Sequence, residues 1–469
     1  MATTTSTSTS TATITSLGVG SGLDLDSILE SLEESKTVSL LDPITAQEES
    51  VEAEITAYES LTSALTSLQT AAEALADESL YESLTTTLSG SGVTAATTSE
   101  AEAGTYTLAV TQLAQSQSLT TDGVESKTTA LGTGTLTIQV GTEDAVSITL
   151  DSSNNTLEGI RDAINASDSG VTASIVNDGS DTPYRLVLTS DNTGTESEMT
   201  VTYTGTDSTD TASSLFGYDG TSGNMTETVA AQNAELTING ISITSQSNTV
   251  EEALQGVTLS LTETSTSQTL TIAQDTDSIL EAITAFVDAY NSYVSVVDEL
   301  TSYDADTDTA GELLGDSTTR RISSELSSDL YSAVEGGTYS YLSQLGISLE
   351  VDGTLTIDED ALTEALEGDV DAVAQFFVGT DDTTGFIEQI TADLDNYLDE
   401  DDGLIAARTD SLETKLEELE ERYEEKQALI DSEMERWTEE FTQLDTLISE
   451  LTSTADYLTT QFDALNSDD

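Results

Sequence analysis

The chain has 469 residues, with 89 Asp and Glu against 11 Lys and Arg, which gives a formal net charge of −78 at pH 7. Such a polyanion repels nucleic acid and anionic membrane surfaces, and no apolar run approaches the length of a membrane span, so neither nucleic-acid binding nor membrane insertion is expected. Cysteine and histidine are absent, which excludes disulfides, metal sites built on thiolate or imidazole ligands, and a Ser-His-Asp triad.

The N-terminal region is predicted to be disordered at first and helical afterwards. Residues 1–16 are rich in Ser and Thr without periodicity, and they show no secretory signal. A helical stripe then begins, and Asp42-Pro43 predicts a helix start with Asp42 as the N-cap. The helix that follows has a coiled-coil-like seam. The first stripe comprises Leu25, Ile28, Leu29 and Leu32, and the seam comprises Val51, Ile55, Tyr58, Leu61, Leu65, Leu68, Ala72 and Leu75.

Residues 100–270 change to the two-residue period of β-strands. Asn239-Gly240 between Ile238 and Ile241 predicts a tight hairpin. Gly, Asn, Asp and Ser turns separate the apolar runs, so the region is predicted to form antiparallel strands, divided into two subdomains. The runs lie at 106–110, 136–140, 146–150, 171–176, 184–189, 199–203, 236–243 and 257–261.

A weak internal repeat is visible within this strand-rich region. Ser147-Ile148-Thr149 leads to Asn155-Thr156-Leu157-Glu158 and then to Gly170-Val171-Thr172. Ser242-Ile243-Thr244 leads to Asn248-Thr249-Val250-Glu251 and then to Gly256-Val257-Thr258. Both copies are predicted to form a strand, a short helix capped by Asn or Thr, and a second strand, although chance matching in a Thr-rich chain is the alternative.

Helical periodicity returns near residue 277. One helix is predicted from there, another after a turn at 304–316, and then a strand pair at 345–357 and a helix at 359–367. The last 60 residues carry heptads whose phase slips once, and a helix of about 80 Å would need a partner helix or neighbouring subunits to cover its stripe. That stripe contains Leu412, Leu416, Leu419, Tyr423 and Ile430, and continues after the slip with Met434, Trp437, Phe441, Leu444, Ile448, Leu451, Ala455, Leu458, Phe462 and Leu465.

Together these elements predict an α+β fold in which long coiled-coil-like terminal helices form a stalk or leg and carry inserted antiparallel β-rich head subdomains. Residues 1–45 are expected to comprise the disordered start and a leg segment that pairs with the coiled-coil leg at 410–469. Residues 46–98 and 275–409 are expected to form a helical stalk domain, and residues 99–274 the head.

The extreme acidity has two interpretations. Disorder is one, since hydrophobic residues make up 36% of the chain. Adaptation to brine is the other, and the periodicity of the apolar residues favours it. At about 1 M salt the Debye length is about 3 Å, against about 10 Å at 0.1 M, so neighbouring carboxylates no longer repel each other strongly. We therefore expect a protein from a halophilic bacterium that folds and assembles in high salt.

Three motifs resemble nucleotide-binding, calcium-binding or catalytic sites, but structural roles explain them better. Residues 18–22 (GVGSG) lack the third Gly and the preceding strand of a dinucleotide fingerprint. Asp304, Asp306 and Asp308 begin like a calcium loop, but Thr and Gly occupy the positions that need Gly and Glu. Acidic pairs at 381–382 and 401–402 are expected by chance among 89 carboxylates. No enzyme activity, cofactor or metal is therefore predicted.

Two further features are candidate contacts. Trp437, the only tryptophan, lies on the C-terminal stripe and is expected to pack against a partner helix. Arg320-Arg321 is the densest basic position, where a salt bridge to nearby acids and a contact between subunits are the alternatives.

Short motifs along about nine-tenths of the chain resemble one protein family. Residues 17–24 (LGVGSGLD) and 26–28 (DSI) are similar to the N-terminal signature of the flagellar filament-capping proteins, also called flagellar hook-associated protein 2. Stretches around 164–165 and at 236–261 resemble a small motif that these proteins share with flagellins. Further family-like segments are 104–106, 110–115, 286–291, 314–318 with Arg320, 345–347 and 352–355. The scarcity of Lys and Arg departs from the family.

The resemblance implies a function that composition does not. Members are exported unfolded through the flagellar export machinery without a cleavable signal peptide. Outside the cell they form a small ring, often a pentamer, at the filament tip, where they promote folding and insertion of flagellin. Partners would be copies of the chain, flagellin and other hook-associated proteins. A hook–filament junction protein or a surface adhesin with exposed heads is the alternative. Assembly contacts are expected at Leu25, Ile28, Leu29, Leu32, Met434, Trp437, Phe441, Leu444, Ile448, Leu451, Leu458 and Phe462, with Arg320 and Arg321 as further candidates.

Overall fold

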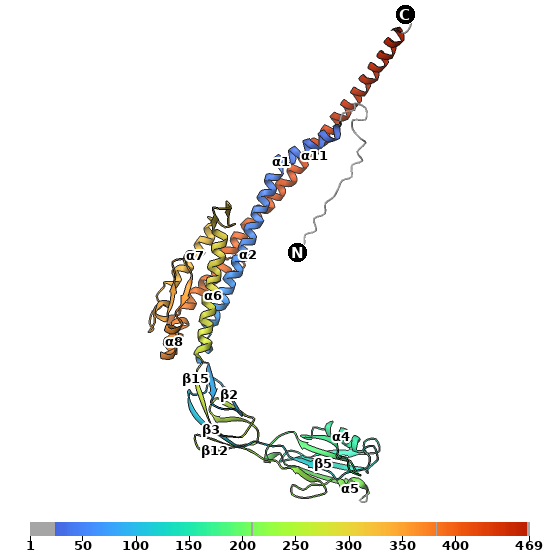
Figure 1. The fold of residues 1–469 in the computed structure, drawn as a ribbon, viewed down its shortest axis with the longest axis vertical. Coiled ribbons are helices and arrows are strands. Elements are labelled where there is room, and N and C mark those ends of the chain that lie inside the picture. Colours follow the sequence, from blue (N-terminus) through green and yellow to red (C-terminus); the bar gives the residue numbers. More distant parts are fainter. Residues whose placement is uncertain (1–23, 208–209, 381, 467–469) are drawn as a thin grey trace. The chain divides into compact units, whose positions relative to one another are not determined.

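The computed structural model describes residues 24–207, 210–380 and 382–466 and divides into two compact units. Among the described residues, unit 1 contains those up to Asp77 and from Leu280 onward, and unit 2 contains those from Glu78 to Ile279. The predicted α+β fold class is confirmed, because unit 1 is mainly helical and unit 2 is built from antiparallel strands (Figure 1).

Unit 1 consists of long helices, shorter helices and three small hairpins. The helices are α1 (Leu25–Leu40), α2 (Asp42–Ala76), α6 (Thr276–Thr301), α7 (Ser317–Leu330), α8 (Glu359–Gly368), α9 (Val370–Phe377), α10 (Phe386–Leu398) and α11 (Leu404–Asn466), with a 3₁₀ turn at Leu342–Leu345. The hairpins are β16 (Tyr303–Asp304) with β17 (Thr309–Ala310), β18 (Ile347–Leu349) with β19 (Leu355–Ile357), and β20 (Gly379–Thr380) with β21 (Thr383–Thr384).

The two ends of the chain pair within unit 1. Helices α1 and α2 run antiparallel to α11, since Glu54 on α2 meets Arg408 at 3.2 Å and Lys36 on α1 meets Glu433 at 2.7 Å. Figure 1 shows these helices side by side. The predicted seam of α2 is buried except at Ile55, which is partly exposed. Burial of this continuous apolar stripe holds the early and late parts of the chain together.

The boundary between α1 and α2 differs from the prediction. Asp42 is the first residue of α2, whereas Leu41 occupies the N-cap position and no side chain caps the helix. Leu41 has helical backbone angles, φ −97° and ψ −46°, and its N–H still bonds to Thr37 of α1. The prediction of Asp42 as N-cap was therefore wrong. Pro43, which lacks an N–H, interrupts the hydrogen bonding without a loop between the helices.

An aromatic cluster fills the centre of unit 1. Phe376 on α9 stacks on Phe386 of α10, with ring centroids 5.4 Å apart, and Phe286 of α6 meets Phe386 edge-on at 6.2 Å. All three rings are fully buried. The sequence reasoning did not predict α9 or α10, although the buried residues Phe386, Ile390, Leu394 and Tyr397 follow helical spacing. Packing of α10 on α2 and of α9 on α10 stabilises these short helices more than their own propensity does.

Asp316 connects α7 to the paired termini. Its Oδ1 atom accepts hydrogen bonds from Thr318 N and Thr319 N at 2.8 Å, which caps α7, and from the Tyr58 hydroxyl at 2.7 Å. Its Oδ2 atom lies 3.6 Å from Arg408 Nε on α11. Burial opposes ionisation of Asp316, but the hydrogen bonds and the Arg408 charge outweigh it and lower the pKa of this carboxyl.

Unit 2 contains two hydrophobic clusters, each enclosed by two sheets. The sheets β1-β15-β3-β11-β12 and β13-β14-β2 enclose one cluster, and the sheets β10-β4-β8-β7 and β6-β5-β9 enclose the other. The strands are β1 (Leu84–Leu88), β2 (Val93–Thr97), β3 (Gly104–Gln112), β4 (Ser118–Thr120), β5 (Gly134–Val140), β6 (Val146–Leu150), β7 (Val171–Asn177), β8 (Tyr184–Ser190), β9 (Met199–Gly205), β10 (Thr226–Val229), β11 (Ala234–Ile238), β12 (Ile241–Ser245), β13 (Thr249–Leu254), β14 (Val257–Leu261) and β15 (Ser265–Gln274). The helices are α3 (Glu78–Glu82), α4 (Leu157–Asn165) and α5 (Thr211–Leu215), with a 3₁₀ turn at Thr195–Ser197.

The predicted hairpin at Asn239-Gly240 is present. It joins β11 to β12 with Ile238 opposite Ile241, and both turn residues have positive φ, 49° and 82°. These angles suit a type I′ turn, which the Asn-Gly pair favours. Sequence did not predict strands before residue 100, yet β1 and β2 occupy residues 84–97, because each pairs with a strand from far along the chain.

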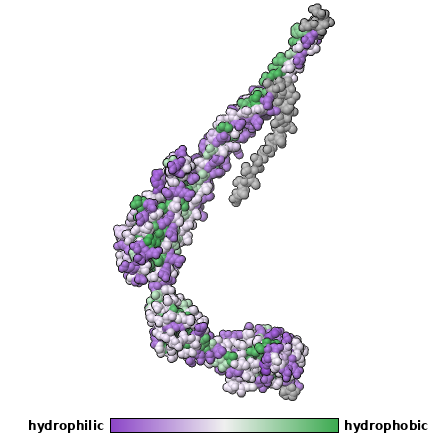
Figure 2. All heavy atoms as spheres, in the orientation of Figure 1, coloured by the Kyte–Doolittle hydropathy of each residue, from purple (hydrophilic) through white to green (hydrophobic). Residues whose placement is uncertain are grey.

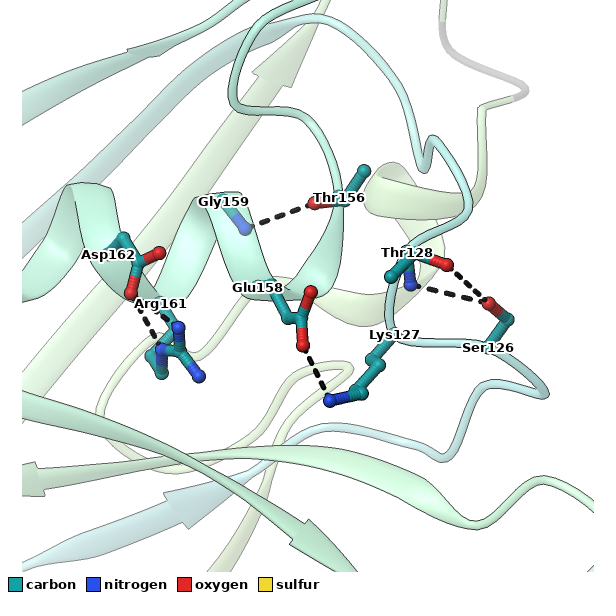
Figure 3. A network of polar contacts seen from close by, with 8 residues as sticks. All are labelled: Ser126, Lys127, Thr128, Thr156, Glu158, Gly159, Arg161 and Asp162. Carbon is teal, nitrogen blue, oxygen red and sulfur yellow. Dashed lines mark hydrogen bonds and ion pairs between the residues drawn. The ribbon is translucent and has the colours of Figure 1, made fainter.

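The internal repeat holds in its first copy only. There β6 and β7 flank α4, whose N-cap Thr156 accepts from Gly159 N at 3.0 Å (Figure 3). In the second copy the predicted helix is wrong, because residues 249–254 form β13. Only seven residues lie between Asn248 and Gly256, against fourteen between Asn155 and Gly170. The shorter segment instead pairs back on β14 as a strand.

Replacing Asp316 with Ala should lower the free energy of unfolding by about 2–4 kcal/mol, because the α7 cap is lost and Tyr58 and Arg408 lose a buried partner. Asp316→Asn should cost less, since Asn also caps helices well. Because the folded pKa is lowered, the contribution of the charge is full above the ordinary carboxyl pKa and is lost as the pH falls through the folded value. Urea unfolding at pH 7 measures both variants. An Asp316→Asn variant as stable as the wild type would contradict a role for the charge, and equal losses in the two variants would contradict a role for the cap.

Candidate assembly surface

The expected assembly contacts lie on α1 and α11 and fall into two groups. Of the α1 positions, Leu25 and Leu29 are buried, Leu32 is partly buried and Ile28 is 44% exposed. Helix α1 packs against α11 and α2 of the same chain. Leu25 and Leu29 are therefore already used within the subunit, and Ile28 is the most accessible of the four expected contacts on α1.

The heptads of α11 are buried only in its first half. Leu412, Leu419 and Ile430 are buried, and Leu416 and Tyr423 are partly buried. After Ile430 the apolar position falls at Met434 instead of 433, so Glu433 lies beside α1 and pairs with Lys36. Four residues in place of three shift the stripe around the helix.

Lys36 and Trp437 form the contact near this phase slip. The Lys36 ammonium lies 5.6 Å from the Trp437 ring centroid and 2.7 Å from Glu433 Oε2. The hydrogen bond from Lys36 lowers the pKa of Glu433. Trp437 is partly buried, so the partner helix expected for it is α1 of the same chain. A cation over the face of an indole ring adds a modest attraction to this packing.

Beyond Phe441, α11 has an exposed apolar stripe. We call Leu444, Leu447, Leu451, Leu458 and Phe462 the tail stripe; their exposed fractions are 40%, 53%, 61%, 47% and 61%. Spacings of three, four and seven residues place them on one face of the helix. Figure 2 shows hydrophobic residues along α11 towards this end. Within the part of the chain that the structure describes, every residue from 451 to 463 is exposed, so no described segment packs on that stretch.

The remaining assembly candidates are less uniform. Met434, Phe441 and Ile448 are partly buried. Arg321 is committed to Glu325 one turn later on α7, at 2.9 Å, and Arg320 donates to the Gly315 carbonyl at 2.9 Å. Both arginines remain exposed. Sequence reasoning missed Leu447, which the three-residue spacing from Leu444 could have indicated.

The residues weighed for metal or enzyme chemistry have local structural roles. Asp304 Oδ1 accepts from the backbone N–H groups of Asp306 and Thr307, at 2.8 and 3.3 Å, in the β16–β17 turn. Asp399 accepts from Asp401 N and Asp402 N in the same manner before α11. Asp381 and residues 18–22 lie outside the described residues. No group of three or more acidic side chains among the described residues could hold a metal ion, and no described helix is long and apolar enough to cross a membrane.

Removing Lys36 tests the contact between α1 and α11 directly. In Lys36→Ala, Trp437 loses its aliphatic and cationic cover, so its fluorescence should shift to longer wavelength and acrylamide should quench it more strongly. Lys415→Ala, an exposed position elsewhere on α11, serves as the control and should leave both signals unchanged. Equal quenching of the two variants would contradict the observed packing.

Comparison with known proteins agrees with this architecture. Residues 21–117 match the family model described as flagellar hook-associated protein 2 N-terminus, and residues 231–453 match the model of its C-terminus. Residues 135–192, which contain the first copy of the repeat, match the flagellin hook IN motif.

Relatives and solved structures give the same result. Flagellar hook-associated protein 2 of Escherichia coli K12 is 43% identical over 455 residues, covering 94% of this chain and 96% of that protein. The Salmonella typhimurium protein is 39% identical, covering 94% and 97%. The crystal structure of the D1-D2-D3 domains of the Escherichia coli flagellar cap protein FliD matches with a TM-score of 0.64 and 41% identity, covering 76% of this chain and 99% of that one. With the family models spanning more than half of its length, the chain belongs to the flagellar hook-associated protein 2 family.

Proposed function

We propose that this chain forms the cap of a bacterial flagellar filament, outside the cell at the filament tip, where copies of it promote folding and insertion of exported flagellin. Family membership supports this function, since a related protein of known structure is named a flagellar cap protein. The tail stripe is the single observation that connects the function to this chain. An apolar face of this length is exposed in the isolated subunit and needs a protein partner.

The two halves of α11 make different contacts in this function. The first half, with Leu412, Leu419 and Ile430, is occupied within the subunit. The tail stripe then serves contacts with other copies of the chain in a ring and with flagellin, and Ile28, Arg320 and Arg321 are further candidate contacts. The family resemblance implies a ring that is often a pentamer.

Serine substitutions test the tail stripe in cells. A deletion strain expressing Leu451→Ser, Leu458→Ser and Phe462→Ser together should bear hooks without filaments and release flagellin monomers, because the apolar face that binds the partner is lost. Ser453→Ala with Thr460→Ala changes exposed residues outside the stripe and should restore swimming. Electron microscopy and flagellin immunoblots of the medium give the readout. Normal filaments with the triple variant would contradict the proposed role of the stripe, and normal filaments in the deletion strain itself would favour the adhesin alternative.

We also propose that the protein is adapted to high salt, which the charge balance supports. In unit 2 the cations are Lys127, Arg161 and Arg185. Each is already paired, with Glu158, Asp162 and Asp178 respectively, at 2.6 Å (Figure 3 shows the first two pairs). The other carboxylates of unit 2 therefore depend on dissolved cations to reduce their mutual repulsion.

Thermal unfolding should accordingly depend on salt. The melting temperature of the purified protein should rise between 0.1 M and 2 M NaCl, because screening removes self-repulsion in the folded state. Circular dichroism at constant pH measures this rise, and light scattering of the same samples tests whether assembly needs the same salt. A melting temperature that stays constant or falls over this range would refute the proposed adaptation.

A further inference from the structure

The last turn of α7 meets α10 through two acidic side chains, Asp329 and Asp393. They line an open cavity of about 520 Å³ together with Arg321 and Glu325 of α7, Tyr397 of α10 and Asp402 before α11. The Oδ2 atom of Asp329 is shielded from solvent, and no described N–H or O–H group donates to it. A buried carboxylate oxygen without a donor costs free energy unless a proton satisfies it.

The potential neutralising groups in this cavity are already committed to Glu325. Arg321 Nε lies 2.9 Å from Glu325 Oε1, and the Tyr397 hydroxyl donates to Glu325 Oε2 at 2.8 Å. These two donors lower the pKa of Glu325 and keep it ionised. Asp402 adds a further negative charge to the lining. No described cation forms an ion pair with Asp329 or Asp393, since Arg321, whose charge also acts on Asp393, is paired with Glu325.

We propose that a single proton shared between the Asp329 and Asp393 carboxyls holds the end of α7 to α10, and that this contact loosens as the solution changes from acidic to neutral. With the proton, one carboxyl donates to the other and the buried Oδ2 atom is satisfied. Without it, two negative charges are held together in a partly desolvated place. Screening by salt weakens this repulsion less than repulsion at the open surface.

The electrostatics of the site agree with this geometry. Burial, followed by the adjacent Asp393 carboxyl and the charge of Glu325, raises the pKa of Asp329 to about 7, from an ordinary value of 3.8. The folded protein then binds more protons than the unfolded chain between these two values. Stability from this pair is therefore greatest near pH 4 and is lost as the pH rises towards 7. Carboxylates with lowered pKa, such as Asp316, act in the opposite direction and at lower pH.

Melting temperatures of the full chain between pH 5 and pH 8, in 2 M NaCl, test the proposal. The wild type should lose about 2–4 °C over this range. Asp329→Asn should remove the loss, because an amide donates a hydrogen bond without titrating. Asp393→Asn should remove it as well, which keeps the test decisive if one variant folds poorly. Asp288→Asn, an exposed position on α6, should keep the wild-type profile.

The outcomes that overturn the proposal are distinct. A wild-type profile that is flat from pH 5 to pH 8 would exclude the shared proton. A melting temperature that still falls with pH in Asp329→Asn would show that the titrating group lies elsewhere. If the melting temperature still falls with pH in Asp393→Asn but not in Asp329→Asn, Asp329 titrates without this partner. That result would exclude the shared proton.

Discussion

The antiparallel packing of α1 and α2 on α11 is the constraint on which the rest of unit 1 depends. It brings residues near the two ends of the chain together through a buried apolar stripe, with Arg408 of α11 placed between Glu54 and Asp316. Asp316 also caps α7, so one carboxylate links the packing of the terminal helices to a helix from the middle of the sequence. Helices α6 and α10 complete the core through their aromatic rings. Because the chain leaves this unit after α2 and returns with α6, a strand-rich insertion can vary without disturbing the helical core.

Charge determines which interactions this chain can use. Some of its few cations join two elements, as Lys36 does between α1 and α11 and Lys127 does at the start of α4. Others pair within their own helix, as Arg321 and Arg436 do. Elsewhere carboxylates are stabilised by backbone N–H groups in tight turns, as at Asp219 and Asp304. The Asp329–Asp393 contact differs, since among the described residues no N–H group donates to Asp329 Oδ2 and no cation forms an ion pair with either carboxyl. The chain thus accommodates its excess of carboxyl groups in three ways. Some are exposed at the surface, some accept hydrogen bonds from backbone N–H groups in turns, and Asp329 and Asp393 are proposed to share a proton.

Sequence periodicity predicted the elements whose burial follows a regular pattern. The α2 seam and the hairpin at Asn239-Gly240 needed only local information, because spacing and turn chemistry determine them. The strands β1 and β2 could not be predicted, since their partners lie more than 150 residues away in the sequence. The helix predicted in the second repeat copy was wrong, because the residues resemble those of the first copy but the segment that contains them is shorter. The apolar stripe of the candidate surface was predicted from residue spacing. Which of its residues are used within the subunit became clear only from the packing of α1. Leu25 and Ile28 have similar hydrophobicity and differ only in the direction they face.

The phase slip after Ile430 separates two kinds of surface on one helix. Before it, Arg408 and Lys426 pair with nearby acids, and Lys415 and Arg422 are two further cations. After Arg436 the sequence of α11 contains no Lys or Arg, although Asp445, Glu450, Asp456 and Asp463 remain. Interhelical ion pairs, which normally specify the orientation and register of packed helices, therefore cannot be provided by cations of this segment. Any protein that packs there must supply its own cations or rely on dissolved ones. The order of apolar side chains alone then decides how that protein is aligned on α11. A partner of opposite charge should bind more favourably than one that is equally acidic.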